Sequence, residues 1–499
     1  MSKAPDRLSQ KTLGRLPKAI GRPAYDREAT RIGIAHMGPG IFHRAHQAVY
    51  IDDVLARQND WAICGISLNS ATVREVLKEQ DFLYTLAILD RESSFRVIGA
   101  IKDVLVAPRQ RQQVLRLLGA PDTKILSLTI TEKGYCLDVD GNLDLGHPAI
   151  RRDLAAPAAP ASTIGYIARS LALRRNAGIR PYTVVSCDNL SDNGRRLARA
   201  VRQYAAQFSP DLAKWIEDEV RFVRTMVDSI TPHSDDALKS RIADALSLTD
   251  GWPIQREAFT QWVVEDDFPL GRPDWEPFGV TMTNNVGAFE NAKLRLLNAA
   301  HSALAYLGLL AGFDTVYEAV SEERIARYLH DMMSKEIMPG LTPPPGLDLA
   351  AYRDAILGRF RNPVIRHRLS QIALDGSQKL PIRVLGTIHD NLDAVRPIGR
   401  LCLIVAAWIG FAQAKAVRGA PIEDPLAEEI TRAARRHPVG DDAVVDDFLG
   451  QRTVFPDTLQ DRPDFRQALK AAYLALGKGE KPDILAALAS NDAPVRPSA

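Results

Sequence analysis

Residues 31–67 read RIGIAHMGPGIFHRAHQAVYIDDVLARQNDWAICGIS, and this stretch decides the fold class. The apolar run 31–37 predicts a buried strand that ends at the turn Gly38-Pro39-Gly40. Residues 44–57 then have apolar side chains at helical spacing, and the apolar run 61–67 predicts a second strand. A strand, a helix and a strand in this order predict two parallel neighbours in one sheet.

The same alternation continues along the first half of the chain. Further strands are predicted at 124–130 (KILSLTI) and 182–186 (YTVVS), with a Pro/Ala-rich surface loop at 155–162 between them. From about residue 289 long helical periodicities replace this pattern, beginning with ENAKLRLLNAAHSALAYLGLLAGF at 290–313. We therefore expect an α/β domain with a doubly wound parallel sheet at 1–287 and a mainly α-helical domain at 288–499.

Composition narrows the class of protein. The 499 residues are long enough for two or three domains, and the formal net charge of +2, with Lys/Arg interleaved with Asp/Glu, favours no nucleic-acid partner. The longest apolar stretch, about 401–412, is too short to span a bilayer, and the N-terminus lacks the apolar core of a signal peptide. We expect a cytoplasmic protein that binds neither nucleic acid nor membranes.

The cysteines predict neither disulfides nor a metal site. Cys64, Cys136, Cys187 and Cys402 lie far apart, and no Cys or His pair has the spacing of zinc ligands. The expectation is a reducing compartment and no bound metal.

The turn after the first predicted strand suggests a dinucleotide site. In that context Gly38 permits a tight turn, and Gly40 lets the backbone approach a pyrophosphate. The third glycine of the usual pattern is replaced by His43, and a two-glycine turn is also an ordinary structural turn. No acidic residue follows the second strand to repel a 2′-phosphate: Asn69 could accept the ribose bond and Arg74 could attract the phosphate, so NAD and NADP both stay open.

A second group of polar residues lies on one predicted helix. Glu290, Lys293, Asn298 and His301 fall within an arc of roughly 140° on an ideal α-helix whose other positions are largely apolar. The alternative is a solvated stripe on an amphipathic helix. The set suits alcohol oxidation, because a lysine among apolar neighbours has a lowered pKa and can act as a base. An asparagine amide can donate to a developing alkoxide, and a neutral histidine can hold a neighbouring hydroxyl.

On these and further motifs the chain resembles the mannitol dehydrogenase family of polyol-specific long-chain dehydrogenases. The resemblance runs from about residue 32 into the last hundred residues. It rests on GPGIFHRAHQAVY at 38–50, SLTITEKGYC at 127–136, SCDNLSDNG at 186–194, MVDSITP at 226–232, EAFTQWVVEDDFPLGRPDWE at 257–276 and KLRLLNAAHSALAYLG at 293–308.

The resemblance implies a Rossmann-type nucleotide-binding domain followed by a helical domain, with the substrate between them. It implies that Lys293 is the general base, that Asn298 and His301 complete its motif, and that Asn189 is a second amide donor to the reacting oxygen. Glu290, one turn before the lysine, is similar to the family's proton conduit.

The resemblance also implies binding residues and a cofactor. The cofactor is expected to be NAD(H), with NADP(H) possible. The residues expected to bind it are Gly38, Gly40, Phe42, Asn69 and Glu132, and those expected to bind substrate are Asp228, Gln371, Lys379 and Arg383.

The segment QIALDGSQKLPIR at 371–383 bears on the substrate. Gln371, Gln378 and Arg383 are more similar to the fructuronate reductase branch than to the mannitol dehydrogenase branch. Arg383 with Lys379 could clamp the carboxylate of a hexuronate, although a structural salt bridge is an equally common use of an arginine. We expect a fructuronate/mannonate oxidoreductase, with a mannitol or arabinitol dehydrogenase as the alternative, acting as a monomer or small homo-oligomer. A catalytically inactive cofactor-bound sensor is a rival that the complete motif disfavours.

Overall fold

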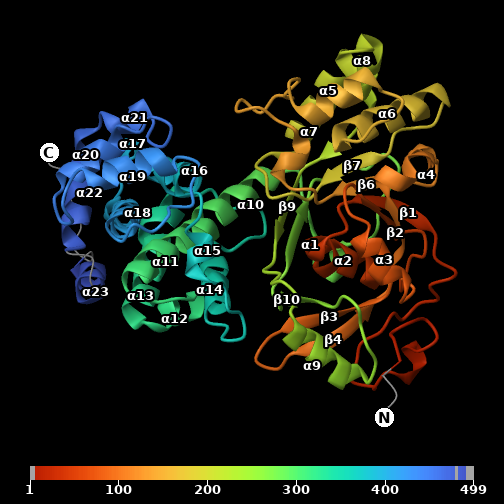
Figure 1. Ribbon diagram of the computed structural model, residues 1–499, viewed down its shortest axis with the longest axis horizontal. Helices are drawn as coiled ribbons and strands as arrows, with labels where there is room; N and C mark the ends of the chain where they lie inside the picture. Colours follow the sequence, from red (N-terminus) through yellow and green to blue (C-terminus); the bar gives the residue numbers. More distant parts are fainter. Residues whose placement is uncertain (1–5, 478–480, 491–499) are drawn as a thin grey trace. The chain divides into compact units, whose positions relative to one another are not determined.

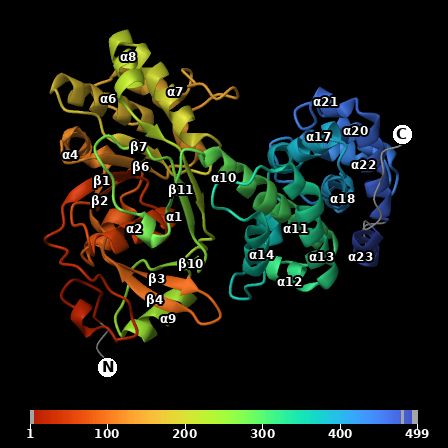
Figure 2. The same ribbon diagram turned by 180° about the vertical axis from the view of Figure 1, so that it is seen from behind.

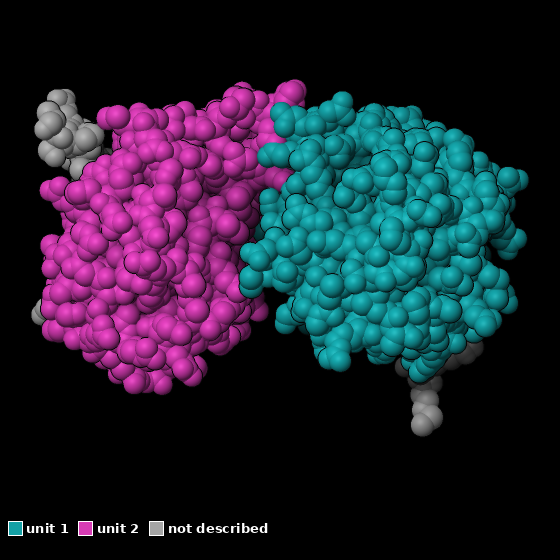
Figure 3. All heavy atoms as spheres, turned by 90° about the horizontal axis from the view of Figure 1, so that it is seen from above, with its two compact units in different colours: residues 1–287 teal, residues 288–499 magenta. Residues whose placement is uncertain are grey.

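The computed structural model describes residues 6–477 and 481–490. The chain divides into two compact units, Met1–Gly287 and Ala288–Ala499, which Figure 3 shows in two colours and which are described separately below.

Unit 1 is built on a six-stranded sheet in which every pair of neighbours is parallel. The strand order is β5-β2-β1-β6-β7-β8, so the chain moves outward from β1 in one direction and later returns to extend the sheet in the other. This is the strand order of a Rossmann fold, in which ligands bind beyond the carboxyl ends of the strands where the direction changes. The strands are β1 (Ile32–Met37), β2 (Ala62–Ser67), β5 (Ile101–Val106), β6 (Ile125–Leu128), β7 (Thr183–Ser186) and β8 (Phe222–Val223). The predicted parallel sheet is confirmed.

Helices cover both faces of this sheet. Ala35 and Met37 of β1 pack among helices on one face, whereas Ile34 points to the other face, as the alternation of a strand requires. Figures 1 and 2 show α6 and α7 alongside β6 and β7. The first face is covered by α4 (Ala107–Gly119), α6 (Thr163–Asn176), α7 (Asn193–Ala206) and α8 (Pro210–Glu219), and the second by α2 (Gln47–Val54) together with strands of the smaller sheets.

Two small sheets complete unit 1, and the sequence patterns did not reveal them. One has the order β10-β3-β4 and the other β12-β11-β9. Their strands are β3 (Tyr84–Leu89), β4 (Ser94–Ile98), β9 (Thr225–Asp228), β10 (Ile254–Glu257), β11 (Gln261–Val264) and β12 (Thr281–Met282). The remaining elements are η1 (Leu13–Arg15), α3 (Thr72–Lys78), η2 (Glu132–Tyr135), α5 (Pro148–Ala155), α9 (Asp236–Leu246) and η3 (Glu276–Phe278).

The helix predicted at 44–57 is wrong in its boundaries. The structure has α1 (Ile41–Ala45) and α2 instead, separated at His46, whose φ of −125° and ψ of −87° are not helical. The buried His46 ring donates a hydrogen bond from Nε2 to the backbone carbonyl oxygen of Gln261, 3.0 Å away. This contact with a distant strand accompanies the break in the helical pattern.

Unit 2 is helical, as expected, and no strand occurs in its described part. Its elements are α10 (Val286–Ala292), η4 (Lys293–Asn298), α11 (Ala299–Leu310), α12 (Val316–Ser321), α13 (Glu323–Asp331), η5 (Met332–Ile337), η6 (Met338–Gly340), α14 (Leu349–Phe360), α15 (Leu369–Ile372), α16 (Gly376–Leu380), η7 (Pro381–Leu385), α17 (Gly386–Asp393), α18 (Gly399–Val417), α19 (Ala427–Arg435), α20 (Ala443–Leu449), α21 (Asp457–Gln460), α22 (Pro463–Ala475) and α23 (Lys481–Ser490).

The central helix α18 is longer than its apolar core suggested. Within the described residues it is the one helix with the length and mean hydropathy, 1.5, of a membrane span. The expectation that the apolar stretch at 401–412 is too short to span a bilayer is therefore wrong for the helix that contains it. However, 72% of that apolar window is buried, and α18 packs against α11, α19 and α22. Its composition is therefore that of the core helix of unit 2.

Candidate functional site

The turn after β1 has the geometry that the two glycines predict. Gly38 has a φ of +86°, and a Cβ atom there would lie 2.1 Å from the Thr129 carbonyl oxygen, so only glycine fits. Gly40 is exposed, has an extended backbone, and a Cβ there would have no neighbour closer than 3.8 Å. Packing within the protein thus requires glycine at Gly38 but not at Gly40, which leaves space beside the backbone for a ligand.

The two glycines should respond differently to alanine. We expect Gly38→Ala to lower the free energy of unfolding by about 2–4 kcal/mol, because the new methyl group combines a positive φ with a backbone clash. Gly40→Ala should change it by no more than about 0.5 kcal/mol. The same Gly40 variant should bind NADH about tenfold more weakly, because its methyl group occupies the free space. Urea unfolding and NADH fluorescence titration measure both, and unchanged affinity in Gly40→Ala would contradict this assignment.

A buried histidine ties this turn to the neighbouring strand. His36 Nδ1 lies 2.8 Å from the Ser127 hydroxyl, and Nε2 lies 2.9 Å from the Thr129 hydroxyl. Thr129 in turn donates to the Gly38 carbonyl at 2.7 Å. Burial lowers the pKa of His36 to about 3, so the ring is neutral at physiological pH. The carboxyl ends of β1 and β6 are therefore linked by hydrogen bonds that the sequence did not predict.

The other candidates of unit 1 lie at or shortly after the ends of strands. Glu132 is exposed in the segment after β6, and Asn189 is exposed after β7, which pairs with β6 up to Leu128 and Ser186. Phe42 stacks on His46 with ring centroids 5.0 Å apart. Asp228 is the last residue of β9 and is 7% exposed.

The segment after β2 carries Asn69 and Arg74, whose surroundings differ. Asn69 is exposed. Arg74 is directed back onto β5, where its guanidinium pairs with Asp103 and donates to the Val104 carbonyl. A 2′-phosphate would have to compete with this carboxylate, so the suggestion that Arg74 attracts phosphate is weakened.

In unit 2 the predicted catalytic helix is continuous but not regular. Lys293–Asn298 forms a π-helical segment between α10, which carries Glu290, and α11, which carries His301. The predicted arc of roughly 140° holds only for an ideal α-helix, in which residues five apart, such as Lys293 and Asn298, are separated by about 140° around the axis. It therefore does not apply to this π-helical segment. A π turn has more residues per turn and therefore brings Lys293 and Asn298 closer to one face, and such turns are common at functional sites. The Lys293 side chain is buried, with 9% exposure, and is not part of a solvated stripe.

His301 is surrounded by rings and positive charge. Its ring centroid lies 4.9 Å from that of Phe360 and 5.5 Å from that of His367. Its Nε2 atom is buried without a hydrogen-bond partner within the described chain. Burial, and after it the charges of neighbours that include Arg383 and Lys293, hold the pKa of His301 well below its usual value. The neutral ring is thus available to a ligand hydroxyl.

Arg383 lies directly against this helix. It belongs to the π-helical segment η7, which packs on η4, and its guanidinium donates to the Asn298 carbonyl at 3.5 Å and to the Ser302 hydroxyl at 3.3 Å. No ion pair of Arg383 occurs within residues 6–477 and 481–490, and its buried Nε atom has no acceptor there. Burial lowers the pKa of this guanidinium. The alternative of a structural salt bridge is therefore absent from the described part of the chain.

The other candidates of the segment 371–383 have no hydrogen bond to the helix of Lys293 within the described chain. The Lys379 amine donates to the carbonyls of Leu374 at 2.6 Å and Ile372 at 3.3 Å, and burial lowers its pKa. Gln371 and Gln378 are exposed on α15 and α16. Within unit 2, the structure therefore brings Arg383 to Asn298 and places Lys293 and His301 close by, whereas Gln371 and Gln378 lie at the surface.

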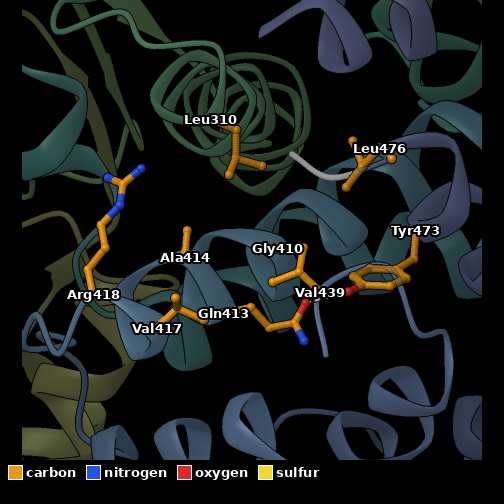
Figure 4. A pocket seen from close by; sticks show the side chains of 10 residues that line it. Leu310, Gly410, Gln413, Ala414, Val417, Arg418, Val439, Tyr473 and Leu476 are labelled. Carbon is orange, nitrogen blue, oxygen red and sulfur yellow. Dashed lines mark hydrogen bonds between the residues drawn. The ribbon is translucent and has the colours of Figure 1, made fainter. Parts of the chain in front are cut away.

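A pocket elsewhere in unit 2 contains none of these residues. It has a volume of about 230 Å³ and is lined by residues of α18, by Leu310 and by Tyr473 (Figure 4). Two of its polar side chains contact each other, Tyr473 through its hydroxyl and Gln413, and the same hydroxyl accepts from the Gly440 amide at 3.2 Å. Among the described residues there is no group of three His, Cys, Asp or Glu side chains arranged to hold a metal ion.

The two domain models of one protein family match the chain in succession. Residues 32–277 match the mannitol dehydrogenase Rossmann domain, and residues 285–477 match the mannitol dehydrogenase C-terminal domain.

Individual relatives are similar over nearly the whole chain. The D-mannonate oxidoreductase of Escherichia coli (strain K12) is 40% identical over 478 residues, covering 94% of this chain and 98% of that protein. The mannitol 2-dehydrogenase of Phaeosphaeria nodorum is 38% identical over 481 residues, covering 94% and 83%. The structure of Pseudomonas fluorescens mannitol 2-dehydrogenase, a ternary complex with NAD and D-mannitol, has a TM-score of 0.82 and 37% identity, covering 97% and 99%.

Proposed function

Because the chain belongs to the mannitol dehydrogenase family of oxidoreductases, we propose that it interconverts D-mannonate and D-fructuronate with a nicotinamide cofactor. In this reaction a secondary alcohol of a sugar acid is oxidised to a ketone, or the ketone is reduced. The proposal assigns nucleotide binding to residues 1–287 and substrate binding and catalysis mainly to residues 288–499, with Asn189 as a further donor to the reacting oxygen.

The placement of Arg383 is the observation that carries the choice of a sugar acid. Its guanidinium is held beside Asn298 and Ser302 and lacks a carboxylate partner within the described chain. The buried Nε donor of Arg383 has no acceptor in the described chain, which costs free energy that a bound carboxylate would recover. A hexuronate or aldonate has such a carboxylate, whereas mannitol and fructose do not.

The residues of the catalytic helix have distinct roles in the proposed reaction. In the oxidative direction the Lys293 amine accepts the proton of the reacting hydroxyl, and in reduction the ammonium returns it. The Asn298 amide donates a hydrogen bond to the oxygen as it gains charge, and the same donor role is proposed for the Asn189 amide. His301 holds a neighbouring hydroxyl and so fixes the sugar. Glu290, one turn before Lys293, passes the proton towards solvent.

The residues at the carboxyl edge of the main sheet suit a dinucleotide. Gly38 and Gly40 form the turn, and the free space beside Gly40 is where the backbone can approach a pyrophosphate. Phe42, Asn69 and Glu132 are the further residues proposed to hold the cofactor. When bound, the nicotinamide accepts or supplies the hydride of the reaction.

Discrimination between NAD(H) and NADP(H) is expected to be modest, with NAD(H) preferred. No carboxylate is present at 68–73 to repel a 2′-phosphate, and Arg74 is engaged by Asp103. Measured kcat/KM values for the two cofactors should therefore lie closer together than in enzymes with an acidic residue after the second strand. A preference of many thousandfold would mean that the specificity residue lies elsewhere.

A substrate panel tests the proposed reaction. Wild-type protein should reduce fructuronate with NADH far faster than it reduces fructose, and should oxidise mannonate faster than mannitol. Tagaturonate, which differs from fructuronate in the configuration of one carbon, tests stereochemical selection within the uronates. Faster turnover of mannitol than of mannonate would overturn the sugar-acid assignment and leave the family assignment intact.

A neutral-polyol dehydrogenase is the second candidate, because one specific observation favours it. Relatives named mannitol 2-dehydrogenase and D-mannonate oxidoreductase are almost equally similar to this chain, at 38% and 40% identity. On this alternative Arg383 would serve only to brace the helix through Asn298 and Ser302. The same panel separates the two candidates.

A further inference from the structure

A buried carboxylate links the two loops that carry Glu132 and Asn189. Asp188 lies two residues after the end of β7, precedes Asn189 in the chain and is 8% exposed. Its Oδ1 atom accepts hydrogen bonds from the backbone amides of Ile130 and Thr131, each at 2.8 Å. One side chain thus joins the segment after β6 to the segment after β7.

The segment after β6 is strained where Asp188 holds it. Thr131 has a φ of +67° and a ψ of 160°, a conformation that is almost restricted to glycine and is unfavourable for a β-branched residue. Such strain persists only where surrounding contacts impose it, and it gathers at functional sites. The next residue is Glu132, so the strained backbone determines where that side chain leaves the loop.

The other oxygen of Asp188 takes part in a second set of contacts. Oδ2 accepts the hydroxyl proton of Tyr135 at 2.8 Å, and this fully buried hydroxyl also contacts the Ser186 hydroxyl. Because the Tyr135 proton goes to Asp188, Ser186 must be the donor in the second contact. Tyr135 therefore also joins the segment after β6 to the end of β7.

The backbone beside Asn189 is also held by a hydrogen bond from a residue that follows it in the chain. The carbonyl of Asp188 accepts a hydrogen bond from Asn193 Nδ2 at 3.0 Å, and the same amide donates to the Thr225 carbonyl at 2.9 Å. Asn193 is fully buried at the start of α7. Asp188, which directly precedes Asn189, is thus restrained through both its side chain and its backbone carbonyl.

We propose that Asp188 is a positioning residue that holds the Glu132 and Asn189 loops in the arrangement needed for cofactor binding and turnover. The proposal rests on the proposed function, in which Glu132 contacts the cofactor and Asn189 donates to the reacting oxygen. Asp188 itself is buried and acts through its neighbours.

The competing explanation is that Asp188 only stabilises the fold, and unit 1 contains a matched control. Asp153 is also fully buried and accepts two backbone amides, Ala161 at 2.9 Å and Ser162 at 2.8 Å, and one hydroxyl, Ser162 at 2.6 Å. It restrains the loop between α5 and α6 and contacts no candidate site residue. The two carboxylates make equivalent sets of hydrogen bonds in different places.

The experiment compares Asp188→Ala and Asp188→Asn with Asp153→Ala and Asp153→Asn in the full chain. Urea unfolding measures stability, NADH fluorescence titration measures cofactor affinity, and steady-state assays with the best substrate of the panel measure kcat. All four variants should lower the unfolding midpoint. Only the Asp188 variants should weaken NADH binding severalfold and lower kcat by about ten- to hundredfold, since small displacements of reacting groups have effects of this size. Tyr135→Phe, which removes one of the three contacts, should have a smaller effect in the same direction.

The outcomes separate this inference from the proposed function. Asp188 variants that lose stability like the Asp153 variants but keep kcat and NADH affinity within about twofold of theirs would overturn it. If wild type turns over no substrate of the panel, the proposed function fails, and NADH affinity alone then decides whether Asp188 positions the cofactor loop. Where Asp188→Ala does not fold, Asp188→Asn and Tyr135→Phe provide the comparison.

Discussion

Replacing Lys293 by alanine should lower kcat by about 10²- to 10⁴-fold while the affinity for NADH stays nearly unchanged. The amine is the proposed proton acceptor, and its removal takes away the group that accepts the proton directly from the reacting hydroxyl. The buried position of Lys293, with 9% exposure, makes replacement of its function by bulk water inefficient. Single-turnover hydride transfer and NADH titration measure the two quantities separately.

The neighbouring cation of the same π-helical segment is the control. Arg295 is paired with Asp390, so Arg295→Ala removes a positive charge two residues away without touching the proposed chemistry. It should change stability by no more than about 1 kcal/mol and leave kcat close to wild type. Lys293→Met, which retains most of the side-chain volume, should behave like Lys293→Ala. Near wild-type kcat in either Lys293 variant would show that another group is the base.

Replacing Arg383 by alanine should raise KM for fructuronate by about 10- to 100-fold and leave the weak activity on fructose almost unchanged. A hydrogen bond to a charged group contributes about 1.5–3 kcal/mol, which corresponds to this range, and fructose has no carboxylate with which to make it. The neutral-polyol candidate predicts the opposite order, with mannitol oxidised well and the substitution nearly silent. Initial rates for both substrates with both proteins measure the difference.

Arg353 offers a matched control for this substitution. Its guanidinium also donates to a serine hydroxyl in unit 2, that of Ser334 at 2.7 Å, but it already has a carboxylate partner in Asp354. Arg353→Ala should therefore leave the ratio of fructuronate to fructose activity unchanged. Equal losses on both substrates in Arg383→Ala would indicate that Arg383 only braces Asn298, because damage to the catalytic helix affects every substrate alike.

Much of the fold could be predicted because its signals are local. The apolar runs at 31–37, 61–67, 124–130 and 182–186 all became strands of the parallel sheet, since buried parallel strands require continuous apolar residues. The strands of the smaller sheets could not be predicted from the sequence. These short segments of two to six residues are stabilised by their partner strands more than by their own hydrophobic pattern. His46 interrupts the predicted helix where its ring contacts the distant Gln261 carbonyl.

The sequence by itself also determined which residue types stand at the candidate site. The positive φ of Gly38 belongs to a local turn, although the clash with Thr129 that also requires glycine there is a tertiary contact. Lys293, Asn298 and His301 share one continuous helix, so their proximity follows from spacing. The branch preference for sugar acids likewise came from the residues at 371–383.

Only the tertiary structure decided what those side chains meet. Arg383 lies against Ser302, 81 residues away in the chain, and Asp188 binds a loop 57 residues earlier. The π turn at Lys293–Asn298 and the strained Thr131 likewise appear only in the fold. The physical reason is that helical and strand periodicities arise between neighbours in the chain. The hydrogen-bond partners of a buried polar group, and whether it has any, depend on segments that meet only after folding.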